Sequence, residues 1–235
     1  MGALTSQVPK PMLPIGPKPL MEHILERLRE ADIERVAIVT GYRGELIEQH
    51  FAEYPIPISW FRQTELNGTA PALGLTRAFT GDDPFLLTFG DIWCDVSDYR
   101  GLMRTLGEAG NVEGVLGVRQ VEDPWQGAAV YVSGEGDVID IVEKPARGTS
   151  GTKWNSAGLY VFRQSIMDEI RRVRISQRGE YELTSAIEQL IKGGYRLRHY
   201  GVSERWRDVG RPEDLDELSA ALGYRATPSP QAPTH

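Results

Sequence analysis

The sequence predicts an α/β protein in which helices flank a mostly parallel, mixed sheet. Two observations predict this class. Over residues 1–120, amphipathic helical patterns alternate with short apolar runs, and strands this apolar are buried on both faces between helical layers. After residue 120, two apolar runs are joined by a Gly-rich stretch, which is typical of an antiparallel hairpin. We therefore expect one domain over residues 1–222, with an α/β half at 1–120 and an α+β half at 121–222.

The first half begins with an amphipathic helix over residues 18–31, because Leu20, Ile24 and Leu28 recur at helical spacing with charged residues between them. The same reasoning predicts further helices at residues 43–51, 69–79 and 102–109. Apolar runs between these helices predict strands at residues 35–40, 58–61, 85–89 and 114–118. Helix and strand thus alternate, which favours crossover connections between parallel strands.

The second half is expected to mix hairpins and helices. A Gly-rich connection joins two strands and a third follows, at residues 128–132, 138–142 and 159–162. Three helices are predicted, the last with a proline in its first turn, at residues 165–172, 184–192 and 211–222. Residues 223–235 are Pro-rich and are predicted to be disordered.

Composition and charge exclude several classes of function. The chain has 235 residues, with 26 Lys and Arg against 33 Asp and Glu, and a formal net charge of −7. It lacks the basic excess typical of nucleic-acid binding, so no nucleic-acid partner is expected. The single cysteine, Cys94, can form no internal disulfide, and the four histidines show no zinc-binding spacing. No apolar run approaches the length of about eighteen residues that spans a membrane, and residues 1–7 lack a signal-peptide pattern. We therefore expect no membrane partner and a cytoplasmic protein.

Lys10 is the first candidate for a functional side chain. It stands between Pro9 and Pro11, on a stiff segment that is expected to be extended and not helical. Its ammonium group is therefore delivered to a fixed point, which suits a phosphate. The alternative is that the prolines only lead into the helix that begins at Lys18.

Asp91 and Asp208 are candidate ligands of a divalent cation. Asp91 follows Gly90 at the end of the most apolar strand, and ligands of open parallel sheets bind at the carboxyl ends of strands. Asp208 lies in the segment W-R-D-V-G before the last helix. Two carboxylates without histidine partners favour Mg²⁺, which takes few protein ligands and leaves positions for phosphate oxygens. The alternative for Asp91 is that it caps the following turn.

Three further segments carry candidate binding residues. Glu143 and Lys144 end a strand and face opposite ways, so the carboxylate can accept bonds from sugar hydroxyls while the lysine meets a phosphate; the alternative is a solvent-exposed charge pair. Asn155 begins the small-residue stretch N-S-A-G, which permits close backbone approach. In residues 63–70 a glycine precedes a helix and Gln63 can read a base edge, although Asn-Gly is also a common turn.

Two groups of residues are interpreted as structural. Arg171, Arg172, Arg174 and Arg178 cluster at a predicted helix end and loop and are expected to form a solvent-exposed face. The following tryptophans are expected to serve packing and not to stack on a ligand: Trp125, Trp154 and Trp206. Neither group is assigned to a binding site.

Taken together and in this order, eight segments resemble the sugar-1-phosphate nucleotidylyltransferases, the family that makes NDP-sugars. The segments are V-P-K-P-M-L-P-I at 8–15, K-P-L-M-E-H-I-L-E-R-L at 18–28, Q-x-x-x-x-G-T-A at 63–70, F-G-D at 89–91, V-E-K-P at 142–145, N-S-A-G-L-Y-V-F at 155–162, G-E-Y-E-L-T at 179–184 and W-R-D-V-G-R-P-E-D-L at 206–215. The resemblance covers nearly the whole chain to residue 222. It implies the Rossmann-like fold of that family, with a nucleotide-binding half at 1–120 and a sugar-phosphate-binding half at 121–222.

The resemblance also implies a reaction. An oxygen of a sugar 1-phosphate attacks the α-phosphorus of a nucleoside triphosphate in line and expels pyrophosphate, with Mg²⁺ as cofactor. Asp91 and Asp208 would hold the Mg²⁺ ion, and Lys10 and Lys144 would be the catalytic residues, on the triphosphate and the sugar phosphate respectively. The implied substrate-binding residues are Glu143, Asn155 and the Gly127 backbone for the sugar, and Gln63 and Gly68, with Thr69 beside them, for the nucleotide. This chemistry needs alignment and charge neutralisation but no protein nucleophile.

The sequence departs from the family pattern in three respects. The pattern begins with an apolar strand and a G-G-x-G-T-R-L loop upstream of a P-L-T segment that appears here as Ala3-Leu4-Thr5, and this sequence contains neither. That strand would lie inside the sheet, so we expect the N-terminal strand to be missing, and the loop would cradle the triphosphate with backbone N–H groups. Pro71 replaces a small residue, and no hexapeptide repeats follow residue 222.

Two hypotheses of function follow. The first is transfer of a nucleotidyl group from a nucleoside triphosphate to a sugar 1-phosphate, with glucose 1-phosphate and dTTP or UTP as the best candidates. The second is a non-catalytic, NDP-sugar-binding pseudo-enzyme or regulatory subunit, because the triphosphate loop is absent. A homo-oligomer is compatible with both. An NAD-type dinucleotide binder is excluded because no G-x-G-x-x-G segment follows a strand.

Overall fold

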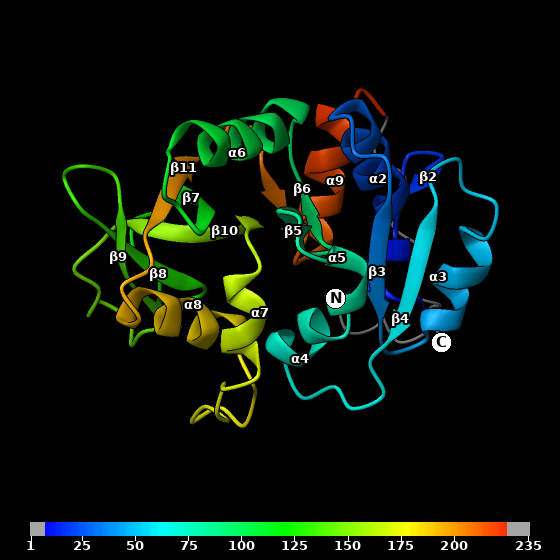
Figure 1. Cartoon of the computed structure of the whole chain (residues 1–235). Coiled ribbons are helices and arrows are strands. Elements are labelled where there is room, and N and C mark those ends of the chain that lie inside the picture. Colours follow the sequence, from blue (N-terminus) through cyan, green and yellow to red (C-terminus); the bar gives the residue numbers. More distant parts are fainter. Residues whose placement is uncertain (1–7, 225–235) are drawn as a thin grey trace.

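The structure is a computed structural model that describes residues 8–224. At its centre is a six-stranded sheet in the order β11-β7-β10-β8-β9, with β5 also paired to β10 (Figure 1). The strands are β5 (Phe85–Thr88), β7 (Gly114–Gln120), β8 (Ala128–Val132), β9 (Val138–Glu143), β10 (Trp154–Phe162) and β11 (Leu197–Gly201). The predicted α/β class with a mixed sheet is confirmed.

Fewer strand pairs are parallel than the sequence predicts. β7 and β11 pair in parallel, whereas β5, β7 and β8 each run antiparallel to β10, and β8 runs antiparallel to β9. β5 and β7 are joined by α6 (Val96–Glu108) and point the same way, as the alternating pattern implies, but β10 lies between them. The alternation of helix and strand predicts that two successive strands point the same way. It does not predict that a later strand of the chain, here β10, lies between them.

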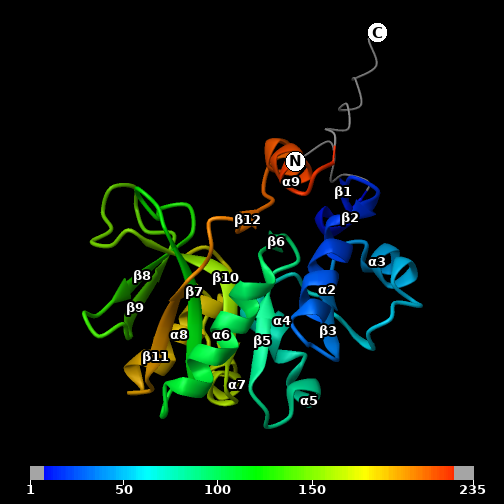
Figure 2. The ribbon, with the colours of Figure 1, turned by 90° about the horizontal axis from the view of Figure 1, so that it is seen from above.

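A second, parallel pair of strands stands apart from this sheet. It consists of β3 (Val36–Thr40) and β4 (Ile58–Arg62), connected through α3 (Gly44–His50). Both views place this pair on the opposite side of the molecule from the β8–β9 hairpin (Figures 1 and 2).

Apolar side chains fill both faces of the central sheet. One core includes Val115 of β7 and side chains of α2, α6 and α9, and the other includes Leu116 and side chains of α4, α7 and α8. Because successive residues of a strand face opposite ways, this confirms burial of the sheet on both faces. The remaining helices of these layers are α2 (Leu20–Glu30), α4 (Thr69–Gly74), α7 (Ser165–Ile170), α8 (Leu183–Lys192) and α9 (Pro212–Ala221). Within residues 8–224, none of the helices is long and apolar enough to cross a membrane.

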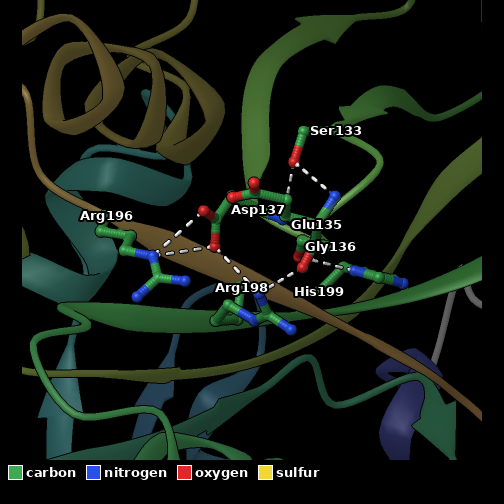
Figure 3. Close-up of polar contacts among 7 residues, drawn as sticks. All are labelled: Ser133, Glu135, Gly136, Asp137, Arg196, Arg198 and His199. Carbon is green, nitrogen blue, oxygen red and sulfur yellow. Dashed lines mark hydrogen bonds and ion pairs between the residues drawn. The ribbon is translucent and has the colours of Figure 1, made fainter.

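The turn of the β8–β9 hairpin is fixed to β11 by charged side chains. Asp137 accepts hydrogen bonds from Arg196 Nε at 3.0 Å and from Arg198 Nη1 at 3.1 Å (Figure 3). An isolated bridge also pairs the backbones of Asp137 and Arg198. The opposite end of this hairpin carries Gly127 and Glu143, so these contacts hold the strands that position two of the predicted site residues.

Several elements have other bounds than predicted. β10 begins at Trp154, α6 begins at Val96 behind a capping box of Asp95 and Asp98, and the predicted helix over residues 69–79 is divided into α4 and α5 (Arg77–Thr80). The strand β11 was not predicted at all. The short elements are the 3₁₀-helix η1 (Lys10–Met12), β1 (Pro14–Ile15), β2 (Lys18–Pro19), β6 (Ile92–Trp93) and β12 (Arg207–Asp208).

The residues after α9 pack onto the molecule as far as the structure describes them. The N–H group of Tyr224 donates a hydrogen bond to the carbonyl of Ser219 at 2.9 Å. The ring of Tyr224 lies with its centroid 5.8 Å from that of His23. The rest of the segment that the sequence predicts to be disordered, residues 225–235, lies outside the described residues.

Candidate active site

The predicted site residues gather where β10 changes its neighbour. Along one edge β10 pairs with β5 at residues 159–162 and with β8 at Asn155. Between these points Gly158 has a φ of +68° and the register against β7 shifts. The segments that leave β5, enter β8 and end β9 therefore meet beside this break, and they carry Asp91, Gly127 and Glu143. Breaks of this kind at strand ends are where open α/β sheets bind ligands.

The two predicted carboxylates are brought to this break from distant parts of the chain. Asp91 follows β5, and Asp208 lies in β12, which pairs antiparallel with β6 so that Asp208 stands opposite Ile92. The N–H group of Val209 also donates to the main-chain carbonyl of Asp91 at 2.9 Å. Partial burial and the negative charge of Asp91 raise the pKa of Asp208 above its ordinary value. The two carboxylates therefore form one electrostatic unit.

Lys10 lies between these carboxylates. Its Nζ is 2.6 Å from Oδ2 of Asp91 and 3.8 Å from Oδ1 of Asp208. The sequence predicts an extended segment around Lys10, but this segment forms one turn of 3₁₀-helix. In this turn the Met12 N–H group donates to the Pro9 carbonyl at 2.8 Å. Proline is compatible with the first turn of a helix because it needs no N–H donor there. Lys10 is therefore held by a 3₁₀ turn and not by the extended segment that the sequence predicts.

Glu143 and Lys144 lie at the end of β9, as the sequence predicts. Lys144 has a φ of +39°, in the left-handed region, and its N–H group donates to the Gly127 carbonyl at 2.8 Å. Burial, and next the negative charge of Glu182, raise the pKa of Glu143 above its ordinary value of 4.5. The ionised form of Glu143 is therefore less favoured in the folded protein than in the unfolded chain, and perturbed pKa values of this kind cluster at functional sites.

We expect Glu143→Gln to make the protein more stable than the wild type at about pH 8, because the amide cannot ionise. A raised folded pKa means that the stabilising contribution of Glu143 is fully present below its unfolded pKa and is lost as the pH rises through the folded pKa. The gap between the two proteins should therefore narrow as the pH falls toward 4.5. Denaturant unfolding of both proteins across this range measures it. A gap that is constant with pH, or that favours the wild type at pH 8, contradicts the prediction.

Asn155 and Gly127 lie against each other beside Glu143. A Cβ atom on Gly127 would come within 2.4 Å of Asn155 Oδ1, so only glycine permits this approach. The Asn155 Nδ2 group donates to the Ser156 carbonyl at 2.8 Å, whereas Oδ1 is buried and has no hydrogen-bond partner among the described residues. A buried acceptor without a partner is costly. It is therefore available to a donor such as a ligand hydroxyl.

The third predicted group, residues 63–69, is joined to the segment before α8. Gly68 has a φ of +135°, and a Cβ there would lie 2.2 Å from the Tyr181 carbonyl oxygen. The Gln63 side chain donates to the Gly68 carbonyl at 3.0 Å, and Thr69 Oγ1 accepts a hydrogen bond from the Leu183 N–H group at 2.9 Å. Gln63, Gly68 and Thr69 therefore form one ordered loop. The structure brings this loop to α8 and not into direct hydrogen-bond contact with the carboxylate pair.

Arg178 contacts a predicted site residue, Glu143, a contact that the sequence does not predict. Its side chain is exposed, as the sequence predicts, but its guanidinium also lies 3.6 Å from Glu143 Oε1 and 3.5 Å from Glu182 Oε1. Arg171 and Arg172 are also exposed, and they pair with acids of their own helix region. The signal that could have found Arg178 is its position immediately before the G-E-Y-E-L-T segment.

Trp206, two residues before Asp208, packs in the core. It is 7% exposed, and its Nε1 group donates to the Ala157 carbonyl at 2.9 Å. The guanidinium of Arg119 lies 4.7 Å from its ring centroid. A cavity of about 500 Å³ opens beside Trp206, and none of the site residues predicted from the sequence lines it.

Comparison with known proteins places these observations in a family. Residues 2–224 match the family model described as nucleotidyl transferase. Agl11 of Haloferax volcanii, a low-salt glycan biosynthesis nucleotidyltransferase, is 32% identical over 222 residues, which are 92% of this chain and 60% of that protein. The bifunctional protein GlmU of Methanocaldococcus jannaschii is 34% identical over 223 residues, 93% of this chain and 50% of that protein. The chain thus spans only 50–60% of the length of these two relatives.

A third relative is matched over most of its length. The UTP–glucose-1-phosphate uridylyltransferase AglF of Haloferax volcanii is 31% identical over 231 residues, 95% of this chain and 92% of that protein. Among solved structures, a UDP-glucose pyrophosphorylase complexed with UDP-glucose has a TM-score of 0.83 and 23% identity, covering 94% of this chain and 92% of that one. This structural likeness confirms the fold.

Proposed function

Because the chain belongs to the nucleotidyl transferase family, we propose that it transfers a nucleotidyl group from a nucleoside triphosphate to a sugar 1-phosphate and releases pyrophosphate. The observation that carries the proposal is the meeting of a carboxylate pair and a predicted sugar-binding set at one break in the sheet. The name of AglF supports glucose 1-phosphate as acceptor and UTP as donor, with dTTP as the alternative donor. A cytoplasmic location fits a reaction that consumes nucleoside triphosphates.

Asp91 and Asp208 fit a Mg²⁺ ion. Both offer hard carboxylate oxygens, and the ammonium of Lys10 between them supports a position that attracts a cation. Within residues 8–224 no group of three or more His, Cys, Asp or Glu side chains could hold a metal. A carboxylate pair leaves coordination positions for phosphate oxygens, as is usual for Mg²⁺. When bound, Mg²⁺ neutralises charge on the phosphates.

The basic side chains serve the two phosphate groups in this proposal. Lys10 approaches the triphosphate, while Lys144, with Arg178 beside Glu143, faces the phosphate of the sugar. An oxygen of the sugar 1-phosphate forms a bond to the α-phosphorus, and the bond from the α-phosphorus to the oxygen bridging to the β-phosphorus breaks. The electron pair of that bond leaves with pyrophosphate. The side chains act by alignment and charge neutralisation.

Hydrogen-bonding groups hold the rest of the substrates. Glu143 and the free Oδ1 of Asn155 accept hydrogen bonds from sugar hydroxyls, next to the Gly127 backbone. Gln63 and Gly68, with Thr69 holding the loop to α8, receive the base. These roles follow the positions that the sequence predicts.

Gly127→Ala is expected to raise KM for the sugar 1-phosphate by about 10- to 100-fold, because a displacement of about 1 Å in a substrate-positioning group costs up to this much. The new methyl group would lie 2.4 Å from Asn155 Oδ1 and must displace it. KM for the nucleoside triphosphate should change little. Steady-state kinetics with each substrate varied in turn separate the two effects, and equal effects on both KM values would contradict the assignment of this residue to the sugar.

Pyrophosphate release in the presence of Mg²⁺ tests the proposed function. UTP, dTTP and the other nucleoside triphosphates are each combined with the 1-phosphates of glucose, mannose and N-acetylglucosamine. We expect one donor and one acceptor to give turnover well above all other pairs. Binding of an NDP-sugar without turnover in any combination would instead support the non-catalytic alternative.

A further inference from the structure

The Lys10 ammonium stands at the place where the carboxylate pair would hold a cation. It lies 2.6 Å from Asp91 and 3.8 Å from Asp208. No other ion pair of either carboxylate occurs within residues 8–224. The pair is thus neutralised in part by one side chain of the chain itself. Two carboxylates that contact the same ammonium are stabilised by its charge, because like charges that share a site disfavour joint ionisation.

The backbone of Lys10 is fixed relative to Asp91. The residue lies in η1 between two prolines, and the turn is closed by hydrogen bonds from Met12 and Leu13. Pro11 packs over Gly90, the residue before Asp91: a Cβ on Gly90 would meet Pro11 Cγ at 3.2 Å. These contacts hold the Lys10 backbone beside Asp91. The flexible side chain, whose exposed fraction is 26%, can rotate away from the carboxylates.

We propose that the Lys10 ammonium occupies the cation position of Asp91 and Asp208 in the substrate-free protein, and that a divalent cation binds only by displacing it. The triphosphate of the nucleotide then receives the displaced ammonium. This inference rests on the proposed function, since it assigns an order to events at the same site. Its consequence is that free Mg²⁺ binds weakly, whereas Mg²⁺ and the nucleotide favour each other's binding through Lys10.

Removal of the internal cation tests this proposal. In Lys10→Met the side chain keeps a similar length without its charge, so Mg²⁺ alone, with no nucleotide and no sugar phosphate, should bind at least about tenfold more tightly than to the wild type. This is within the usual range of coupling between two sites. Isothermal titration calorimetry with MgCl₂ measures the two dissociation constants. Equal or weaker binding by Lys10→Met, including no measurable binding to either protein, overturns the proposal.

Lys153→Met is the matched control. It removes the same charge from an exposed lysine that forms no ion pair among the described residues, so it leaves no carboxylate pair without its cation. This variant should bind Mg²⁺ like the wild type. If it gains affinity as Lys10→Met does, the effect comes from net charge and not from the site.

Thermal unfolding provides a second readout in case Lys10→Met folds poorly without metal. Its midpoint should be lower than that of the wild type in EDTA, because two carboxylates then face each other unneutralised, and MgCl₂ should raise it by more than it raises the wild-type midpoint. Equal shifts in both proteins overturn the proposal. Neither measurement needs turnover, so unchanged Mg²⁺ affinity in a protein that releases pyrophosphate would refute this inference alone. Tighter Mg²⁺ binding in a protein without turnover would refute the proposed function alone.

Discussion

Pyrophosphate release is expected to fall by about 10²- to 10³-fold when Asp91 is replaced by Asn, the usual loss for one electrostatic group that acts at the reacting centre. The substitution keeps the size of the side chain and removes its charge. The contact that ties β12 to this segment, from the Val209 N–H group to Asp91, uses the main-chain carbonyl and survives. The loss should therefore appear in kcat, measured by pyrophosphate release, while the folded structure is retained.

Asp216→Asn is the control for this loss. Asp216 lies on α9, is exposed and makes no ion pair among the described residues. The same chemical change there should leave turnover within about twofold, because exposed positions away from special contacts tolerate substitution. Asp91→Asn with wild-type kcat would show that the carboxylate pair takes no part in the reaction. Loss of circular-dichroism signal in that variant would show that its effect is structural.

Trp206→Ala is expected to lower the free energy of unfolding by about 3–5 kcal/mol, the usual cost of truncating a buried aromatic side chain. Trp206 is 7% exposed, and its indole N–H group donates to the Ala157 carbonyl at 2.9 Å, so the substitution leaves both a cavity and an unpaired carbonyl. Because Asp208 follows in β12, activity should fall as well. Urea unfolding followed by circular dichroism measures the stability.

Trp125→Ala supplies the comparison for this prediction. Trp125 is 38% exposed and contacts the guanidinium of Arg147 at 5.6 Å from its ring centroid. Its loss should cost less than about 1 kcal/mol. If the two variants were destabilised equally, Trp206 would not have the supporting role that its burial indicates.

The positions of Asp91 and Asp208 were predictable in large part from sequence. Asp91 ends a strongly apolar strand after a glycine, and such a strand in an alternating α/β pattern directs its carboxyl end to the ligand-binding edge. What the sequence cannot show is which charges meet across long separations. Lys10 and Asp91 are 81 residues apart, and only the fold shows that the lysine expected to face a phosphate contacts two carboxylates here.

The sequence does not predict the start of β10, the strand β11 or the break between α4 and α5, and each has a physical reason. The first half of β10 contains the small residues N-S-A-G, which have low strand propensity, and its pairing with β7 and β8 outweighs that preference. β11 has the sequence L-R-H-Y-G, which contains no apolar run and so gives no strand signal. One of its polar residues, Arg198, pairs with Asp137 of the β8–β9 turn. The break between α4 and α5 comes at Thr76, whose Oγ1 donates to the Leu73 carbonyl at 2.8 Å. Local hydrogen bonds of this kind compete with a continuous helix.

Arg178 shows the same limit at the site. The sequence predicts that the four arginines of the cluster form a solvent-exposed face. Arg178 is exposed, but it also pairs with Glu143. The pairing of Arg178 with Glu143 arises because the segment before α8 folds back over the end of β9. No spacing rule connects these two residues, so the prediction needed the tertiary structure.

Phosphorus NMR of a mixture of the protein, MgCl₂, UTP and glucose 1-phosphate tests the proposed function most directly. We expect the resonances of pyrophosphate and of an NDP-sugar diphosphate to grow in equal amounts, and both to grow at least about a hundredfold more slowly with Asp91→Asn. The same result with dTTP in place of UTP would identify the other donor. Growth of orthophosphate alone, or an unchanged spectrum for all donors and sugar 1-phosphates while the protein binds an NDP-sugar, would contradict nucleotidyl transfer as the activity of this chain.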